Sequence, residues 1–170
     1  MILKKNLVFL GMMGSGKSSI GYLISKKLNL TFVDVDNLIE EESGMTISKI
    51  FKTKGEGNFR NLEEKITLKA LRGVNKVISL GGGGFINNRI RKEVLINHFS
   101  FWLNWSESIL LKRIKDSKKR PVAFQASDVE IKLLIKKRTK IYSKAQFKIN
   151  CNKLSKTEIV KQIIKINELN

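Results

Sequence analysis

A glycine-rich turn near the start of the chain, FLGMMGSGKSSIG at residues 9–21, is the feature that most constrains the fold. It follows a short apolar run, LVFL at 7–10, and it precedes a stretch at 17–28 in which apolar residues recur at helical spacing. The sequence therefore predicts a strand, a tight turn and a helix in immediate succession. This is the first unit of a parallel α/β fold.

Four residues of this turn, Gly11, Gly16, Lys17 and Ser18, fit the pattern Gly-x-x-x-x-Gly-Lys-Ser. Glycines let the backbone wrap with its N–H groups pointing inward, and the following helix N-terminus adds donors that favour phosphate. Lys17 would reach the β- and γ-phosphates, and the Ser18 hydroxyl would face Mg²⁺. We expect Lys17 to be exposed and to support no core. The turn predicts a nucleoside triphosphate site and leaves the acceptor open.

The rest of the chain alternates strand-like and helix-like segments. Strands are expected at 7–10, 31–35, 76–80, 100–104 and 147–150. Helices are expected at 17–28, 36–43, 46–53, 58–72, 88–97, 107–115 and 128–143, and a last one after Ser155, which forms a capping box with Glu158. The alternation predicts a three-layer α/β fold, with a parallel sheet covered by helices on both faces. No linker or repeat divides residues 1–170, so we expect one domain.

The net charge of +18 is carried mostly by lysine, with 26 lysines against 7 arginines. The lysines are spread along the chain, which indicates a solvated basic surface and not a nucleic-acid partner. In such a chain each arginine is a candidate for a contact that lysine cannot make.

No apolar run approaches the roughly 20 residues of a membrane span, and the start of the chain lacks the features of a signal peptide. We therefore expect a cytoplasmic protein without a membrane partner. The single cysteine, Cys151, excludes an internal disulfide and a cysteine-cluster metal site.

Two aspartates in FVDVDNLIE, Asp34 and Asp36, stand at the C-terminal end of the second expected strand. Ligands bind beyond the C-terminal strand ends of open α/β sheets. One carboxylate could serve Mg²⁺ and the other an acceptor hydroxyl. Alternatively, Asp36 caps the helix that follows. The stretch alone leaves both interpretations open.

Two arginines and a run of four glycines add to this picture. Arg60 and Arg138 could each grip a carboxylate with two parallel hydrogen bonds. The alternative is a surface ion pair, for which Glu63 and Glu64 are possible partners of Arg60. The glycines at 81–84 end the third expected strand, where they indicate backbone lying close to a small substrate, or else a flexible turn. His98 precedes the fourth strand, and we expect it to have no catalytic role.

From Val8 to about Tyr142 the chain resembles the shikimate kinase family. The phosphate loop is shared by many families, but the combination of further motifs is specific in order and spacing. These are Phe-x-Asp-x-Asp-x-x-Ile-Glu at 32–40, Phe-Arg-x-x-Glu at 59–63, Leu-Gly-Gly-Gly at 80–83, Arg-Pro at 120–121 and Arg-x-x-x-Tyr at 138–142.

The resemblance implies a P-loop kinase fold like that of nucleoside monophosphate kinases, with a five-stranded parallel sheet. It implies a substrate-binding segment over about 35–63 and a mobile lid over about 114–126. The implied reaction is ATP-dependent phosphorylation of the shikimate 3-hydroxyl with Mg²⁺, a step of aromatic amino-acid biosynthesis. The sequence leaves the oligomeric state open, and a monomer is the default expectation.

The same resemblance implies roles for individual residues. The implied ATP contacts are Gly11, Gly14, Ser15, Gly16, Lys17, Ser18, Ser19, Arg113 and Arg120. The implied shikimate contacts are Asp36, Arg60, Gly82 and Arg138. Ser18 and Asp34 would hold Mg²⁺. The residues implied to act in catalysis are Lys17, Asp36 and Arg120.

The chain departs from the family pattern at a few positions. Gly84 replaces a side chain usually found there, Val122 and Ala123 stand where leucines are usual, and the adenine loop near 152–156 carries no residue that we assign.

Three other functions are weighed against this one. A gluconate-type kinase would use the same scaffold, but the paired aspartates with Arg60 and Arg138 favour shikimate. A nucleoside monophosphate kinase would need a base pocket and arginines for a phosphate acceptor. A P-loop domain that binds nucleotide or nucleic acid without catalysis is disfavoured, because every expected catalytic position is filled.

Overall fold

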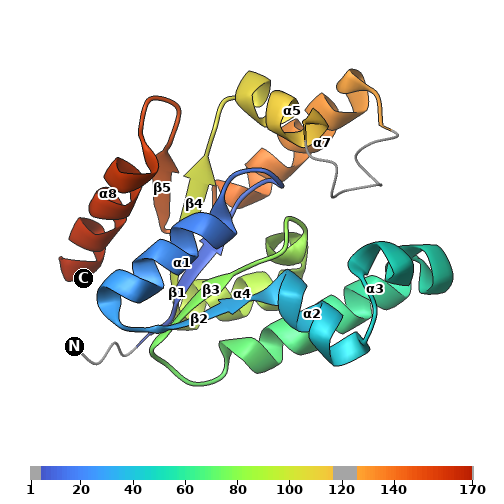
Figure 1. Ribbon diagram of the computed structural model, residues 1–170, viewed down its shortest axis with the longest axis horizontal. Coiled ribbons are helices and arrows are strands. Elements are labelled where there is room, and N and C mark those ends of the chain that lie inside the picture. Colours follow the sequence, from blue (N-terminus) through green and yellow to red (C-terminus); the bar gives the residue numbers. More distant parts are fainter. Residues whose placement is uncertain (1–4, 117–125, 170) are drawn as a thin grey trace.

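The computed structural model describes residues 5–116 and 126–169. A five-stranded parallel sheet crosses the molecule in the order β2-β3-β1-β4-β5 (Figure 1). Its strands are β1 (Leu7–Leu10), β2 (Thr31–Asp34), β3 (Lys76–Ser79), β4 (Phe99–Asn104) and β5 (Phe147–Asn150). The predicted five-stranded parallel sheet is confirmed.

Helices cover both faces of the sheet (Figure 1). On one face lie α1 (Lys17–Leu28) and α8 (Lys156–Glu168). The other face is covered by α2 (Val35–Ser43), α3 (Ile47–Leu71), α4 (Asn88–Asn97), α5 (Glu107–Lys115) and α7 (Asp128–Tyr142). A short 3₁₀ turn, η1 (Gly84–Ile86), follows β3. The predicted three-layer α/β class is confirmed.

Side chains of β1 alternate between the two cores. Leu7 and Phe9 pack in the cluster that includes residues of α1 and α8, whereas Val8 and Leu10 pack in the cluster on the other face. All four are almost completely buried. A strand that is buried on both faces needs apolar residues at every position, which explains the continuous run LVFL.

The segment after α2 differs in one respect from the sequence prediction. Helices were expected at 46–53 and 58–72, and the structure has the single element α3 across both. Gly55 interrupts it with φ of 78° and ψ of 168°, which is not a helical conformation. The two helices are therefore joined at a sharp break, with no loop between them.

The strand order decides where a ligand can bind. After β1, the chain builds β2 and β3 on one side of it and then β4 and β5 on the other. In such sheets the crevice opens beyond the C-terminal ends of the strands where the order reverses. The turn after β1 lies at this place.

At the other end of the sheet, where the strands begin, buried polar groups link neighbouring segments. Asn6 is fully buried, and its side-chain amide donates to Leu71 O and Gly73 O, at 3.0 Å each. Its Oδ1 accepts from Lys76 N. His98 is also buried, at the start of β4, far along the sheet from the expected site. No helix among the described residues is long and apolar enough to span a membrane.

Candidate active site

The loop between β1 and α1 requires glycine at three positions. Gly11, Gly14 and Gly16 have φ values of 143°, 77° and 87°, in the region that side chains disfavour. A Cβ on Gly11 would also lie 3.0 Å from both Leu103 O and the Ser15 hydroxyl. The backbone of this loop therefore favours glycine at all three positions, whether or not a ligand is bound.

Lys17 does not project into solvent, which corrects the sequence prediction. Its side chain is only 7% exposed, and Nζ donates to Gly11 O at 3.0 Å and to Met12 O at 3.1 Å. The carbonyls of the loop are acceptors that the folded turn brings within reach of the ammonium group. Through these two hydrogen bonds Lys17 stabilises the loop. Ser18 and Ser19, which follow it in α1, are exposed.

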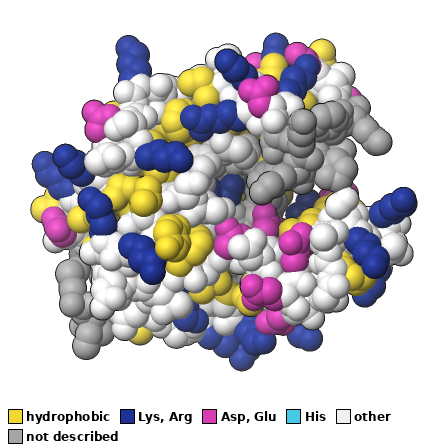
Figure 2. All heavy atoms as spheres, viewed as in Figure 1, with side chains coloured by type: hydrophobic (Ala, Val, Ile, Leu, Met, Phe, Trp, Pro, Cys, Tyr) yellow, Lys and Arg dark blue, Asp and Glu magenta, His cyan; other side chains and the backbone are white. Residues whose placement is uncertain are grey.

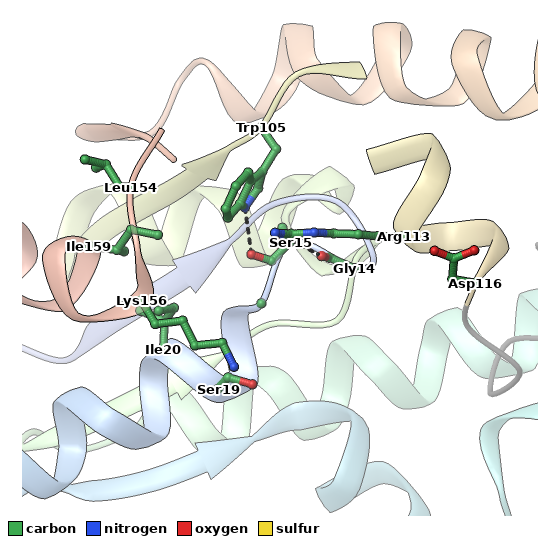
Figure 3. Close-up of a pocket in the computed structure, with 11 residues that line it drawn as sticks. Gly14, Ser15, Ser19, Ile20, Trp105, Arg113, Asp116, Leu154, Lys156 and Ile159 are labelled. Atoms are coloured by element: carbon green, nitrogen blue, oxygen red, sulfur yellow. Dashed lines mark hydrogen bonds between the residues drawn. The ribbon is translucent and has the colours of Figure 1, made fainter. Parts of the chain in front are cut away.

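A cavity of about 620 Å³ lies beside the loop (Figure 3). It is lined by residues of the loop, α1, α5 and α8 and of the segments that follow β4, α5 and β5: Gly14, Ser15, Gly16, Ser19, Ile20, Trp105, Arg113, Asp116, Leu154, Lys156 and Ile159. Arg113 lies across the loop and donates from Nη1 to Gly14 O at 3.3 Å. The structure therefore brings Arg113, predicted from the family resemblance, to the phosphate loop.

Asp34, and not Asp36, caps α2. Asp34 Oδ1 accepts from Asp36 N at 3.1 Å and from Asn37 N at 3.4 Å. Asp36 lies in the first turn of the helix, because α2 begins at Val35, directly after the strand. The capping role considered for Asp36 is thus wrong, and its carboxylate lies beside Gly81.

The glycine run after β3 passes close to the side chains expected to bind the acceptor. A Cβ on Gly81 would lie 2.5 Å from Asp36 Oδ1 and 2.9 Å from Glu63 Oε1. A Cβ on Gly83 would lie 2.3 Å from Arg60 Nη1. A side chain at Gly81 or Gly83 would therefore have to displace these charged groups.

Gly82 connects these acceptor-side residues to the phosphate loop. A Cβ there would lie 3.4 Å from Arg138 Nη1 and 3.4 Å from Met13 N. The Tyr142 hydroxyl donates to Gly82 O, and burial raises the pKa of this phenol to about 12, so it stays protonated. The residues that follow β1 and β3 therefore meet beside α7.

Arg60 is bound by two carboxylates of its own helix. Its Nη1 donates to Glu63 Oε2 at 2.7 Å, and Nε and Nη2 donate to Glu56 Oε1. Burial acts to lower the pKa of Arg60, but Glu63 and Glu56 raise it, so the guanidinium stays charged. Of the two partners considered from the sequence, Glu63 is correct, whereas Glu64 pairs with Arg89.

Glu63 is a site residue that the sequence reasoning named only as an ion-pair partner. Its carboxylate is 2% exposed and lies against Gly81, as Asp36 does. Burial raises the pKa of Glu63, and Asp36 adds to this shift, whereas Arg60 and Arg138 oppose it. The site thus combines two carboxylates with two guanidinium groups.

Figure 2 shows a hollow bordered by acidic side chains, between the part of the molecule with α2 and α3 and the rest. Lysine and arginine side chains are scattered over this face and form no single stripe. The lid expected at 114–126 lies mostly outside the described residues, and so do Arg120, Val122 and Ala123.

The residues expected to hold Mg²⁺ suit a nucleotide-bound ion. No cluster of three metal-binding side chains occurs in the described part of the chain. Mg²⁺ that is bound with phosphates takes only one or two protein ligands and keeps several waters. The exposed Ser18 hydroxyl at the start of α1, with Asp34 at the end of β2, is a donor set of this kind.

Comparisons with known proteins show which family the chain belongs to. Residues 13–168 match the family model described as shikimate kinase. A shikimate kinase of Thermodesulfovibrio yellowstonii is 38% identical over 162 residues, covering 95% of this chain and 94% of the relative.

Two solved structures are similar over nearly their whole length. Shikimate kinase from Aquifex aeolicus has a TM-score of 0.86 at 37% identity, covering 96% of both chains. The enzyme from Acinetobacter baumannii in complex with shikimate has a TM-score of 0.91 at 26% identity, covering 98% of this chain and 94% of that one.

The parallel sheet, the phosphate loop and the cavity beside it define a P-loop kinase. The chain belongs to the shikimate kinase family, and it is an ATP-dependent kinase.

Proposed function

We propose that this kinase transfers the γ-phosphoryl group of ATP to the 3-hydroxyl of shikimate, giving shikimate 3-phosphate and ADP. The observation that carries the proposal is the position of Gly82, with Arg138 on one side and Met13 of the phosphate loop close by. Acceptor and nucleotide would therefore meet at this glycine.

The acceptor would be held by charge and geometry. Arg60 and Arg138 would bind the shikimate carboxylate, and the backbone of Gly82 would contact the ring. The bonds of Arg60 to Glu56 and Glu63 use three of its N–H donors, and a guanidinium has five. The remaining donors can form the forked contact to a carboxylate.

Asp36 would orient the acceptor hydroxyl and take its proton as the new O–P bond forms. Phosphoryl transfer depends on alignment and on charge neutralisation more than on covalent chemistry. Lys17 would leave the carbonyls of Gly11 and Met12 and donate to the phosphates. Arg120, outside the described residues, would add charge from the lid, and Arg113 would contact the adenine.

Ser18 and Asp34 would hold Mg²⁺. When bound, the ion would supply positive charge that offsets the charge of the phosphates. The proposal further includes a monomer in the cytoplasm, with a place in aromatic amino-acid biosynthesis and without a nucleic-acid or membrane partner.

The test is to identify the product. The purified protein is incubated with ATP, Mg²⁺ and shikimate, and the reaction is followed by ³¹P and ¹H NMR. We expect one new phosphomonoester whose coupling places the phosphate on the 3-hydroxyl. Phosphate on another hydroxyl, or inorganic phosphate as the only product, would contradict the proposal.

A further inference from the structure

Trp105 lines the cavity and belongs to none of the motifs above. It follows β4 directly, and its indole Nε1 donates to Ser15 O at 2.9 Å (Figure 3). The guanidinium carbon of Arg113 lies 3.8 Å from the centroid of its ring. Trp105 therefore contacts both the phosphate loop and the arginine beside it.

The indole face restricts Arg113. An exposed arginine on a helix surface otherwise samples many rotamers, and ordering it costs conformational entropy when a ligand binds. Here the guanidinium lies over an aromatic face, an attractive arrangement, and also donates to Gly14 O. Arg113 is thus already placed at the cavity before a nucleotide arrives.

The indole N–H orients a peptide of the phosphate loop. The C=O and N–H of a trans peptide point in opposite directions. Because Trp105 holds Ser15 O, the N–H of Gly16 is directed to the other side of that peptide. Backbone N–H groups of such loops are the donors that bind phosphate.

We propose that Trp105 is a positioning residue for the nucleotide. It holds Arg113 as a flat cationic wall for a purine base, and it fixes the Gly16 N–H for a phosphate oxygen. Leu154 and Ile159 line the same cavity with apolar side chains suited to a planar base. This inference rests on the nucleotide site of the proposed function and adds to it a residue that acts at both ends of the nucleotide.

Two substitutions separate the two contacts. Trp105→Phe keeps an aromatic face and loses the N–H donor, and Trp105→Leu loses both. Binding of the ATP analogue AMP-PNP is measured by calorimetry, with Mg²⁺, in both variants. We expect a loss of about threefold for Trp105→Phe and about tenfold for Trp105→Leu. Two controls are included. The Trp105 variants should bind shikimate with wild-type affinity. Trp102→Phe, which changes a buried tryptophan away from the cavity, should bind AMP-PNP with wild-type affinity.

A third substitution tests whether the ring acts through Arg113. When Arg113→Ala is added to each Trp105 variant, Trp105→Phe and Trp105→Leu should no longer differ in their affinity for AMP-PNP. Wild-type affinity in Trp105→Leu, or in Trp105→Phe should the leucine variant not fold, would overturn the inference. The inference would also be overturned if the two Trp105 variants still differed in AMP-PNP affinity when Arg113 is replaced by alanine. If the unaltered protein itself fails to bind AMP-PNP, the proposed function fails instead.

Discussion

Among single residues, Arg60 shows most clearly why the type of side chain matters. It is tied to Glu63, which is almost completely buried, and to the exposed Glu56, at the point where the backbone passes Gly83. A lysine would keep the charge but would lose the planar fork that can serve two carboxylates of the protein and one of a substrate. Arg60 is therefore a suitable residue for testing carboxylate recognition.

Arg60→Lys should raise the KM for shikimate at least about tenfold, since hydrogen bonds to charged groups are worth about 1.5–3 kcal/mol. The KM for ATP should change little. The matched control is Arg89→Lys, which alters an exposed ion pair with Glu64 and should leave both values unchanged. An equal rise in both KM values would show that Arg60 holds the fold together and does not select the acceptor.

Asp36→Asn should lower kcat/KM by on the order of 10²-fold or more, in the range that loss of a general base produces. The fold should be retained, because Asp34 supplies the cap of α2. Steady-state kinetics test this, with Glu41→Gln as a control that removes a charge from the exposed side of the same helix. Near-normal activity of Asp36→Asn would remove Asp36 from the chemistry.

At the scale of elements, the turn after β3 joins the acceptor residues of α2 and α3 to α7. Gly81 and Gly84 are both buried, but they differ in the space around them. A Cβ on Gly81 would meet two carboxylates at 2.5 and 2.9 Å, whereas one on Gly84 would meet Leu80 and Glu63 at ordinary contact distances of 3.6 and 3.7 Å. The two glycines therefore form a matched pair.

Gly81→Ala should displace Asp36 and Glu63 and lower kcat/KM for shikimate by about tenfold or more, because a misplaced catalytic group is costly. Gly84→Ala should retain activity and melt within about 2–4 °C of the wild type, the shift that 1 kcal/mol produces at this size. The test compares kcat/KM for shikimate and the Tm of the two variants with the wild-type values. Equal effects of the two substitutions would contradict the geometry described for this turn.

The sequence predicted most elements and a good part of the site, for identifiable reasons. The phosphate loop could be found because its glycines and Lys17 are local and ordered along the chain. The sequence offered only Asp36 as a possible cap of α2, and the cap is Asp34, because the helix begins directly where β2 ends against β3. Trp105 carried no signal, since an aromatic residue after a strand is most often part of the core.

For the molecule as a whole, His98, which lies at the start of β4 and away from the site, should make the stability of the fold depend on pH. Burial lowers the pKa of His98, and Lys5 and Lys76 add to this, whereas Glu93 opposes it. The folded protein therefore takes up this proton less readily than the unfolded chain, whose histidine titrates near 6.5. Stability should be unaffected by His98 above about pH 7 and should fall as the pH drops below about 6.5.

His98→Asn removes the titrating group and keeps an acceptor for the N–H of Asn6, which donates to His98 Nδ1 at 3.4 Å. The Tm of the wild type should fall more steeply than that of the variant between about pH 7.5 and about pH 5, since protonation would favour only the unfolded chain. Calorimetric melts across this range measure the difference. Parallel Tm curves would show that His98 is not the group responsible.

The central claim is that this P-loop kinase takes shikimate as its acceptor. Release of ADP is measured with ATP and Mg²⁺ against shikimate, gluconate and CMP, each at the same range of concentrations. The paired carboxylates and guanidinium groups around the glycine turn predict turnover with shikimate and no turnover above background with the other two. Preferred turnover with gluconate or CMP, or ADP release that does not depend on any acceptor, would contradict the account.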